Sequence, residues 1–217
     1  SNIEKAKLYI IVGEQKKLIQ SSISAPKSAN WIVQKKQLGT GHAVKQALPF
    51  LRANSQAVVL YGDGPLVKIS TLKKLIFDAA KNNLTLLTFE SANPKGLGRI
   101  IRESNSKVSG IVEEKDASSS EKKIKEVNSG ILATSTKNLQ QWLPKLRNKN
   151  ASKEYYLTDI VALCSSENKS IKAINLRDTS ELLGVNDNRE LQNLERIYQK
   201  ETALSFLKSG VKFADIN

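Results

Sequence analysis

The sequence has few of the residues that build redox centres, zinc clusters or base-stacking surfaces. It contains one cysteine and one histidine in 217 residues, and only 6% of the residues are aromatic. A single cysteine excludes an intrachain disulfide and any zinc cluster built on cysteines. Because Cys164 ends the apolar stretch 160–164, we expect it to lie in the hydrophobic core and not to act as a nucleophile.

Long apolar runs and methionine are missing as well. No apolar run reaches the roughly 18 residues that a membrane-spanning helix needs. The first residues, Ser-Asn-Ile-Glu-Lys-Ala-Lys, contain no hydrophobic signal-peptide core. With the low cysteine content, this predicts a cytoplasmic protein that does not contact a membrane. Because the sequence has no methionine, it does not begin with an initiator residue, and we expect a fragment or a processed chain.

Basic residues, in contrast, are abundant, and the net charge is +13 at pH 7. Such an excess attracts nucleic acids or small anionic substrates such as nucleotides. The lysines are spread along the whole chain, and aromatic residues do not alternate with them as a base-stacking surface requires. We therefore interpret most of these charges as solvated surface and predict that nucleic acid is not a partner. A module that binds nucleotides or nucleic acid without catalysis remains the alternative.

Apolar runs alternate with helical patterns along the first part of the sequence. The predicted strands are 8–12, 31–33, 57–60 and 84–89, and the predicted helices are 14–19, 40–51 and 70–79. The run 57–60 has no polar alternation, which indicates a strand covered on both faces. Strands that alternate with helices are typical of a parallel sheet between two helical layers.

The pattern changes after the fourth predicted strand. Segments 98–102 and 107–113 flank a polar turn and predict a hairpin. The later predicted elements are a loop at 117–123, a strand at 131–134, helices at 139–146 and 155–165, and an edge strand at 171–174. We therefore predict one domain over residues 1–217, with an α/β fold, a mostly parallel sheet flanked by helices, and a β-hairpin insertion.

The clearest helix is the last one. Asp187 or Asn188 is placed to cap its first turn, Glu190 is spaced for a capping box, and Gly210 ends it. Its apolar residues recur at helical spacing and form a stripe, which we expect to pack on the sheet. The stripe consists of Leu191, Leu194, Ile197, Tyr198, Leu204 and Leu207.

Two features indicate a nucleotide site. The glycine-rich turn 39–41 opens a helix, where unpaired backbone N–H groups bind anions. Asp63 follows an apolar strand, and ligands of open α/β sheets lie outside the carboxyl ends of the strands. A carboxylate at this place suits Mg²⁺. Each feature also has a simpler explanation. Many helices begin with glycine, and an aspartate followed by glycine and proline, as Asp63 is by Gly64 and Pro65, often only forms a turn.

Other polar positions lie next to the ends of predicted strands or helices. Asn186 precedes the last helix, the charged cluster 113–116 ends a strand of the hairpin, and Asn128 begins a polar turn before an apolar strand. A helix cap, a solvated loop and turn chemistry also account for these three. The single histidine, His42, we expect to pack near the start of its helix and not to serve as a base or metal ligand.

Taken in order, these motifs resemble one family, the uridyltransferase domain of the bacterial bifunctional N-acetylglucosamine-1-phosphate uridyltransferase/glucosamine-1-phosphate acetyltransferase. The resemblance covers essentially the whole chain. It is carried by residues 34–43, 61–63 with 65–66, 98–100, 110–113 with 115–117, 126–131, 154–159 and 184–187. Each motif alone is weak evidence, whereas their common order and spacing are specific.

That family has a Rossmann-like nucleotidyltransferase fold and transfers a uridylyl group from UTP to N-acetylglucosamine 1-phosphate. The products are pyrophosphate and UDP-N-acetylglucosamine, which serves peptidoglycan and lipopolysaccharide synthesis. The resemblance implies direct in-line attack of the sugar phosphate on the α-phosphorus, so that catalysis depends on positioning and charge neutralisation. Another sugar-nucleotide pyrophosphorylase, with a different base or sugar, remains the alternative.

The resemblance implies a role for each matching residue. The uracil would be bound by Gln34, Gly39 and Thr40. The ribose and phosphates would be lined by Tyr61, Gly62 and Asp63. Mg²⁺ would be held by Asp63, the catalytic residue, and Asn186. The N-acetylglucosamine part would be bound by Gly98, Glu113 and Asn128, with Tyr156 and Thr158 nearby.

The sequence departs from the family pattern in three places. The family's opening strand and its Leu-Ala-Ala-Gly-x-Gly-Thr-Arg-Met loop, with a downstream lysine, are missing. We therefore expect unpaired strand edges and an incomplete active site, so that the fragment alone is inactive. The chain stops near Asn217, where the family continues into a β-helix acetyltransferase domain, through which the resemblance implies a homotrimer. Gly64 stands where a larger residue is usual in the family, and we expect it to loosen this turn.

Overall fold

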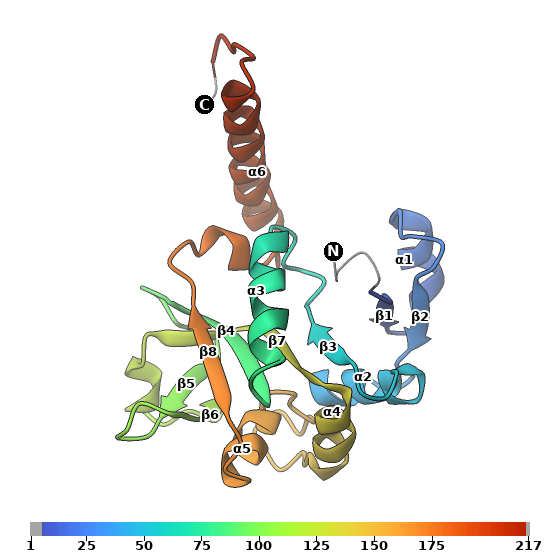
Figure 1. The fold of residues 1–217 in the computed structure, drawn as a ribbon, viewed down its shortest axis with the longest axis vertical. Coiled ribbons are helices and arrows are strands. Elements are labelled where there is room, and N and C mark those ends of the chain that lie inside the picture. Colours follow the sequence, from blue (N-terminus) through green and yellow to red (C-terminus); the bar gives the residue numbers. More distant parts are fainter. Residues whose placement is uncertain (1–5, 216–217) are drawn as a thin grey trace.

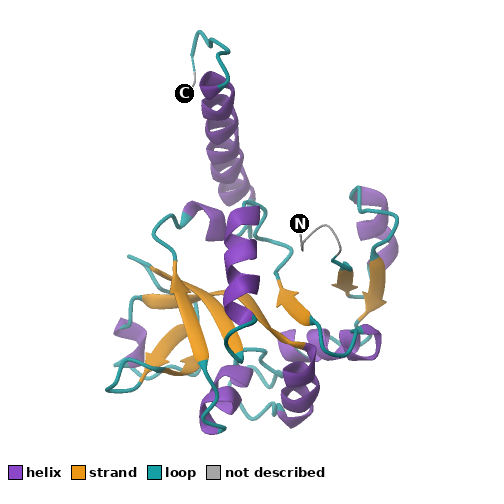
Figure 2. Cartoon of the chain, viewed as in Figure 1, coloured by secondary structure: helices purple, strands orange, loops and turns teal. Residues whose placement is uncertain are grey.

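The computed structural model describes residues 6–215, which form a larger and a smaller sheet with helices packed around the larger one (Figure 1). The strands are β1 (Tyr9–Val12), β2 (Asn30–Val33), β3 (Gln56–Val59), β4 (Leu84–Glu90), β5 (Arg99–Arg102), β6 (Val108–Val112), β7 (Glu126–Ser135) and β8 (Ile171–Asn175). The α-helices are α1 (Lys16–Ser22), α2 (Thr40–Ala47), α3 (Ile69–Ala79), α4 (Thr136–Trp142), α5 (Asp159–Ser166) and α6 (Asn188–Lys208). Figure 2 separates helices from strands by colour.

The larger sheet has six strands in the order β6-β5-β7-β4-β8, and β3 also pairs with β7. Strand β7 is antiparallel to β3, β4 and β5, whereas β4 and β8 are parallel. Strands β3, β4, β5 and β8 therefore share one direction, and β6 and β7 run the other way. The predicted α/β fold and hairpin are confirmed. The prediction of a mostly parallel sheet is correct in that four of the six strands share one direction. It is wrong for the pairing of neighbouring strands, because the antiparallel strand β7 lies between strands of that shared direction.

The smaller sheet consists of β1 and β2, which pair in parallel. Among the described residues, β3 pairs only with β7. Gln56 is exposed, residues 57–59 are half-buried, and Leu60, just beyond the end of the strand, is 46% exposed. Ala57 and Val59 pack against one part of the core and Val58 against the other, so the predicted coverage of both faces is confirmed for residues 57–59 and is wrong for Leu60. One edge of β3 has no neighbouring strand among the described residues.

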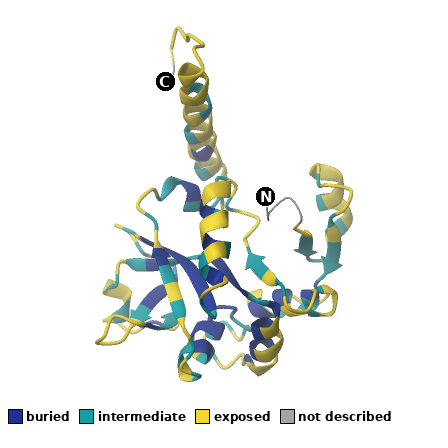
Figure 3. Cartoon of the chain, viewed as in Figure 1, coloured by how far each residue is buried: buried dark blue, intermediate teal, exposed yellow. Residues whose placement is uncertain are grey.

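The core lies on both faces of the central strands, which are the most buried part of the chain (Figure 3). Successive residues of β4 point to opposite faces, so that Leu86 packs with residues of α4 and α5 and Leu87 with residues of α3. Each fully buried leucine contributes about 1.5–3 kcal/mol of stabilisation. Cys164 is buried among them, and burial raises the pKa of its thiol to about 12. The expected core role of this cysteine is confirmed.

Helix α6 leaves the body of the protein (Figure 1). Asp187 caps it, since its side chain accepts a hydrogen bond of 2.8 Å from the Glu190 N–H. The Glu190 carboxylate accepts from the backbone of Asn186, one residue before the position of a regular capping box. Leu194 is 3% exposed, but Tyr198 is 61% exposed. The prediction that the whole stripe packs on the sheet is wrong, because 21 residues of helix extend about 30 Å, beyond the edge of the domain.

Several predicted boundaries also move. The strand predicted at 131–134 is longer, and the next helix begins at Thr136, where Ser135 caps it by accepting from the Asn138 N–H. The helix predicted from residue 155 begins only at Asp159. None of the helices formed by residues 6–215 is both long and apolar enough to cross a membrane.

Glu167, at the end of α5, joins this helix to α4. Its carboxylate accepts hydrogen bonds from the indole of Trp142 at 3.0 Å and from the side chain of Gln141. It also forms ion pairs with Lys145 at 2.8 Å and with Lys169 at 2.7 Å. Hydrogen bonds from Lys145, Lys169 and Trp142 lower the pKa of Glu167 to about 2.

We expect Glu167→Gln to lower the melting temperature by a few degrees at pH 7, because the neutral amide loses both ion pairs. A carboxylate whose pKa falls on folding stabilises the protein above its unfolded-state pKa, and this contribution is lost as the pH falls through the folded-state pKa. The difference between variant and wild type should therefore shrink from pH 4.5 to about pH 2. Circular dichroism melts measure it, with the exposed Glu195→Gln as control; a difference independent of pH contradicts the prediction.

Candidate functional site

The turn before α2 is held against the segment before α5. Gly39 has a φ of 107°, and a Cβ at this position would lie 2.7 Å from the Tyr155 carbonyl oxygen. The Gly41 N–H donates to this carbonyl at 2.8 Å, and the Tyr155 N–H donates to the Leu38 carbonyl at 2.8 Å. The Gly41 N–H is thus already paired, so the prediction of a free anion-binding donor is wrong at this position.

Side chains strengthen the same contact. The Thr40 hydroxyl accepts a hydrogen bond of 3.0 Å from the Leu157 N–H. The buried Gln34 donates from its amide nitrogen to the Gly39 carbonyl at 3.1 Å, and this nitrogen lies 2.9 Å from His42 Nδ1. His42 is therefore accounted for by hydrogen bonds near the start of its helix, as expected from the sequence.

Asp63 lies beside the turn that precedes α6. The Val185 N–H donates to the Asp63 carbonyl at 2.9 Å, and a Cβ on Gly184 would lie 3.8 Å from the Asp63 carboxylate. Asn186 follows directly, so the structure brings together the segments of the two predicted metal ligands. A Cβ on Gly62 or Gly64 would meet no atom within 4 Å. The backbone on both sides of Asp63 is therefore open, and the space at Gly64 accommodates a larger side chain.

The donors at this place fit a magnesium ion. A carboxylate and an amide carbonyl are hard oxygen ligands, and Mg²⁺ usually binds to one or two carboxylates together with substrate phosphates and water. Residues 6–215 contain no cluster of three or more histidine, cysteine or acidic side chains arranged to hold a metal. Asp63 and Asn186 would thus supply part of a coordination shell that a phosphate ligand completes.

Tyr61 links this region to the hairpin. Partial burial raises the pKa of its hydroxyl, and so do the nearby negative charges of Glu113 and Asp63, while a hydrogen bond with Thr40 acts in the opposite direction. The Tyr61 ring packs on Gly130, where a Cβ would come within 2.6 Å of its Cδ2 atom. Thr40, Glu113 and Gly130, from three other segments, therefore lie around this tyrosine.

The residues predicted for the sugar lie together. Arg99 pairs with Val112 across the hairpin, which places Gly98 next to Glu113. A Cβ on Gly98 would lie 3.3 Å from Glu113 Oε2. The Thr158 hydroxyl donates to Glu113 Oε1 at 2.8 Å. The Asn128 N–H donates to the Gly98 carbonyl at 2.9 Å, which attaches β7 to the same place.

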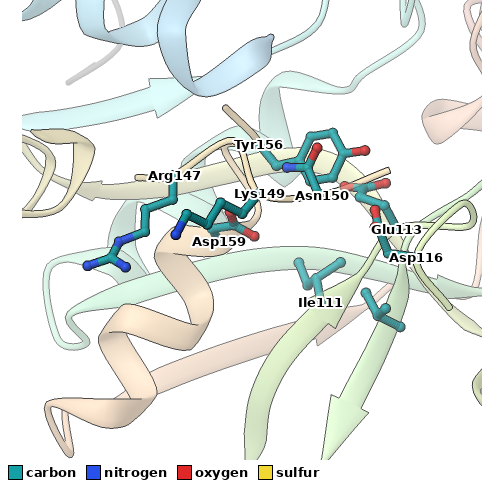
Figure 4. Close-up of a pocket in the computed structure, with 9 residues that line it drawn as sticks. Ile111, Glu113, Asp116, Arg147, Lys149, Asn150, Tyr156 and Asp159 are labelled. Carbon is teal, nitrogen blue, oxygen red and sulfur yellow. The ribbon is translucent and has the colours of Figure 1, made fainter. Parts of the chain in front are cut away.

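A cavity of about 390 Å³ opens on the other side of Glu113 (Figure 4). It is lined by Ile111, Val112, Glu113, Asp116, Arg147, Lys149, Asn150, Tyr156 and Asp159. In Figure 4 the carboxylates of Glu113 and Asp116 lie at one end and the cationic groups of Arg147 and Lys149 at the other. Burial raises the pKa of Asp159, and the charges of Glu113 and Asp116 add to this effect.

Tyr156 is therefore part of this cavity, and burial is the main cause that raises the pKa of its hydroxyl. Sequence reasoning missed Arg147, Lys149 and Asn150. They belong to an irregular segment with no periodicity and no recognisable motif. Only the fold of this segment against the hairpin brings them next to Glu113, so no sequence signal was available to find them.

We expect Gly130→Ala to cost more stability than Gly96→Ala. Both glycines have positive φ angles, 80° and 83°, and alanine in this region costs about 1–2 kcal/mol. Only at Gly130 would the new methyl overlap the Tyr61 ring, whereas at Gly96 it meets open space. Overpacking adds about 1–3 kcal/mol. Urea denaturation gives both free energies of unfolding, and equal costs would show that the ring does not press on Gly130.

Comparisons with known proteins identify the family and the fold. Residues 2–179 match the sequence profile of a family described as nucleotidyl transferase. The chain is 46% identical over 209 residues to the "Bifunctional protein GlmU" of Dechloromonas aromatica. This alignment covers 96% of this chain and 46% of that protein. The chain is 44% identical over 209 residues to the protein of the same name from Vesicomyosocius okutanii, with the same coverage. The chain thus spans about half the length of these relatives.

Solved structures share the fold. A putative glucose-1-phosphate thymidylyltransferase from Bacillus anthracis aligns with a TM-score of 0.65 at 18% identity, over 96% of this chain and 78% of that one. HddC from Yersinia pseudotuberculosis aligns with a TM-score of 0.53 at 19% identity, over 80% and 72%. At these identities the likeness concerns the fold alone, and it confirms the predicted Rossmann-like nucleotidyltransferase architecture. By its profile match and by the order of its motifs, the chain belongs to the nucleotidyl transferase family.

Proposed function

We propose that the chain is the uridyltransferase half of a bifunctional enzyme, which transfers a uridylyl group from UTP to N-acetylglucosamine 1-phosphate. The name of its relatives supports this proposal. The observation that carries it is the position of Tyr61, next to Thr40 and within electrostatic range of Asp63 and Glu113. Residues matched to the nucleotide and residues matched to the sugar therefore meet at one place.

On the nucleotide side, Gln34 and the turn at Gly39 would recognise the base. The amide nitrogen of Gln34 is already engaged with the Gly39 carbonyl and His42. Its carbonyl oxygen makes no hydrogen bond within residues 6–215 and would accept one from the N3–H group of uracil, a donor that cytosine lacks. Because Gly39 has no side chain, the base would approach the backbone closely.

On the sugar side, Glu113 would be the main acceptor. The Thr158 hydroxyl occupies its Oε1 atom, and its Oε2 atom lies beside Gly98, where a side chain would intrude. This oxygen would accept a hydrogen bond from a hydroxyl or the amide N–H of the N-acetylglucosamine part. Glu113 and Thr158 would thus fix the sugar so that its phosphate points toward Asp63.

The reaction requires no covalent intermediate with the protein. A phosphate oxygen of the sugar phosphate bonds to the α-phosphorus of UTP, and the bond to pyrophosphate breaks. The chain's contribution is to align the two anions, which replaces a bimolecular encounter by a positioned one. Asp63 and Asn186 would hold Mg²⁺, which when bound offsets the repulsion between the two sets of phosphates.

The proposal is tested by calorimetric titration with UDP-N-acetylglucosamine and Mg²⁺. We expect saturable binding that Asp63→Asn weakens by about tenfold or more, since the amide loses the charge that attracts the cation. The matched control is Asp78→Asn. Asp78 lies near the C-terminal end of α3, whereas Asp63 precedes the start of this helix, so the control should bind as the wild type does.

Two further titrations separate the alternatives. Equal affinity for UDP-glucose or for a thymidine-based sugar nucleotide would favour a pyrophosphorylase of different specificity. Binding of random duplex DNA that weakens steeply with salt, without binding of any sugar nucleotide, would overturn the proposal in favour of a nucleic-acid-binding module.

A further inference from the structure

Arg99 is a buried arginine on β5 whose side chain bridges two segments. It is 1% exposed. Its guanidinium donates to the carbonyl of Leu97, just before its own strand, and to the Glu114 carboxylate at 2.5 Å and the Lys122 carbonyl at 3.5 Å in the segment after β6. One planar group thus fixes the start of β5 against the loop that follows the hairpin.

The contacts of this guanidinium lie directly beside the sugar-side residues. Leu97 precedes Gly98, and Glu114 follows Glu113. We propose that Arg99 is a positioning residue, which sets the gap between the Gly98 backbone and the Glu113 carboxylate and so determines how a sugar is held there. The inference rests on the proposed function only for the identity of the ligand.

Two details indicate that the arginine at position 99 serves to fix this geometry and does not serve stability alone. A guanidinium presents several donors in a fixed fork, whereas a lysine ammonium offers a single centre. In addition, Arg99 Nε is buried and has no hydrogen-bond partner among residues 6–215. An unpaired buried donor lowers stability. The presence of an arginine at this position is therefore explained better by the contacts of the other guanidinium nitrogens.

The same hairpin contains a matched control. Arg102, three residues further along β5, forms a two-pronged ion pair with Glu126 at 2.7 and 2.8 Å. This pair has the same chemistry as that of Arg99 with Glu114. It is more exposed, with 36% of the Arg102 side chain accessible, and its partners do not flank Gly98 or Glu113.

The experiment compares Arg99→Lys with Arg102→Lys in two measurements. Amide hydrogen exchange reports on the N–H groups that bond to the sugar-side backbone: Asn128 to Gly98, and Asp116 and Ala117 to Glu113. We expect faster exchange at these three amides in Arg99→Lys and unchanged exchange in Arg102→Lys. We also expect Arg99→Lys to weaken binding of N-acetylglucosamine 1-phosphate about tenfold, within the range of coupling in one hydrogen-bond network, with Arg102→Lys close to wild type.

The outcomes separate this inference from the proposed function. If exchange and affinity are the same in both variants, the inference is overturned. Faster exchange throughout the sheet in Arg99→Lys would mean a structural role only, and would also overturn it. If the wild type binds no sugar phosphate, the proposed function fails, while the exchange comparison still decides the role of Arg99. Should Arg99→Lys not fold, Glu114→Gln, which keeps an acceptor but removes the charge, replaces it in both measurements.

Discussion

The pairing of β7 with three other strands is the interaction on which the rest of the structure depends. Along one edge its early residue Val127 faces β5 and its last four residues pair with β3, while its other edge pairs with β4. Along the first edge, the strand next to β7 changes from β5 to β3 around Gly130. Gly130 has a positive φ angle, and at the same place the pairing of β7 with β4 shifts in register. Asn128 and the Tyr61 contact lie at this point. The site therefore occurs where one strand changes its neighbour.

The charges of the site are opposite to those of the whole molecule. The chain carries a net charge of +13, yet Asp63, Glu113, Asp116 and Asp159 gather around the site and its cavity. The positive charge of the whole molecule and the negative charge of these carboxylates suit different tasks. A basic molecule attracts anions from solution, whereas carboxylates are suited to accept hydrogen bonds from hydroxyl and amide groups and to bind a hard cation. A site lined only with lysines would attract the same anions without orienting them.

Much of the fold could be predicted because strands and helices of this chain follow its apolar runs closely. The failures have physical causes. Residues 155–158 have helical spacing, but hydrogen bonds to the turn at 39–41 hold them outside the helix. The place of β7 in the sheet depends on contacts between distant residues, which periodicity does not contain. Gly39 could be singled out because its backbone conformation favours glycine, and Asp63 because it follows an apolar strand, whereas the contacts of Arg99 and Arg147 become visible only in the fold.

The long reach of β7 also governs the order in which the protein can fold during synthesis. Residues 56–59 find their partners only at 132–135, and most of β4 pairs with the same strand. A ribosome-bound chain that ends before β7 would hold two apolar strands with nothing to pair with, and closing so long a loop is slow. The nascent chain thus exposes unpaired apolar strands until β7 has emerged, and this interval is when protection by a chaperone has the greatest effect.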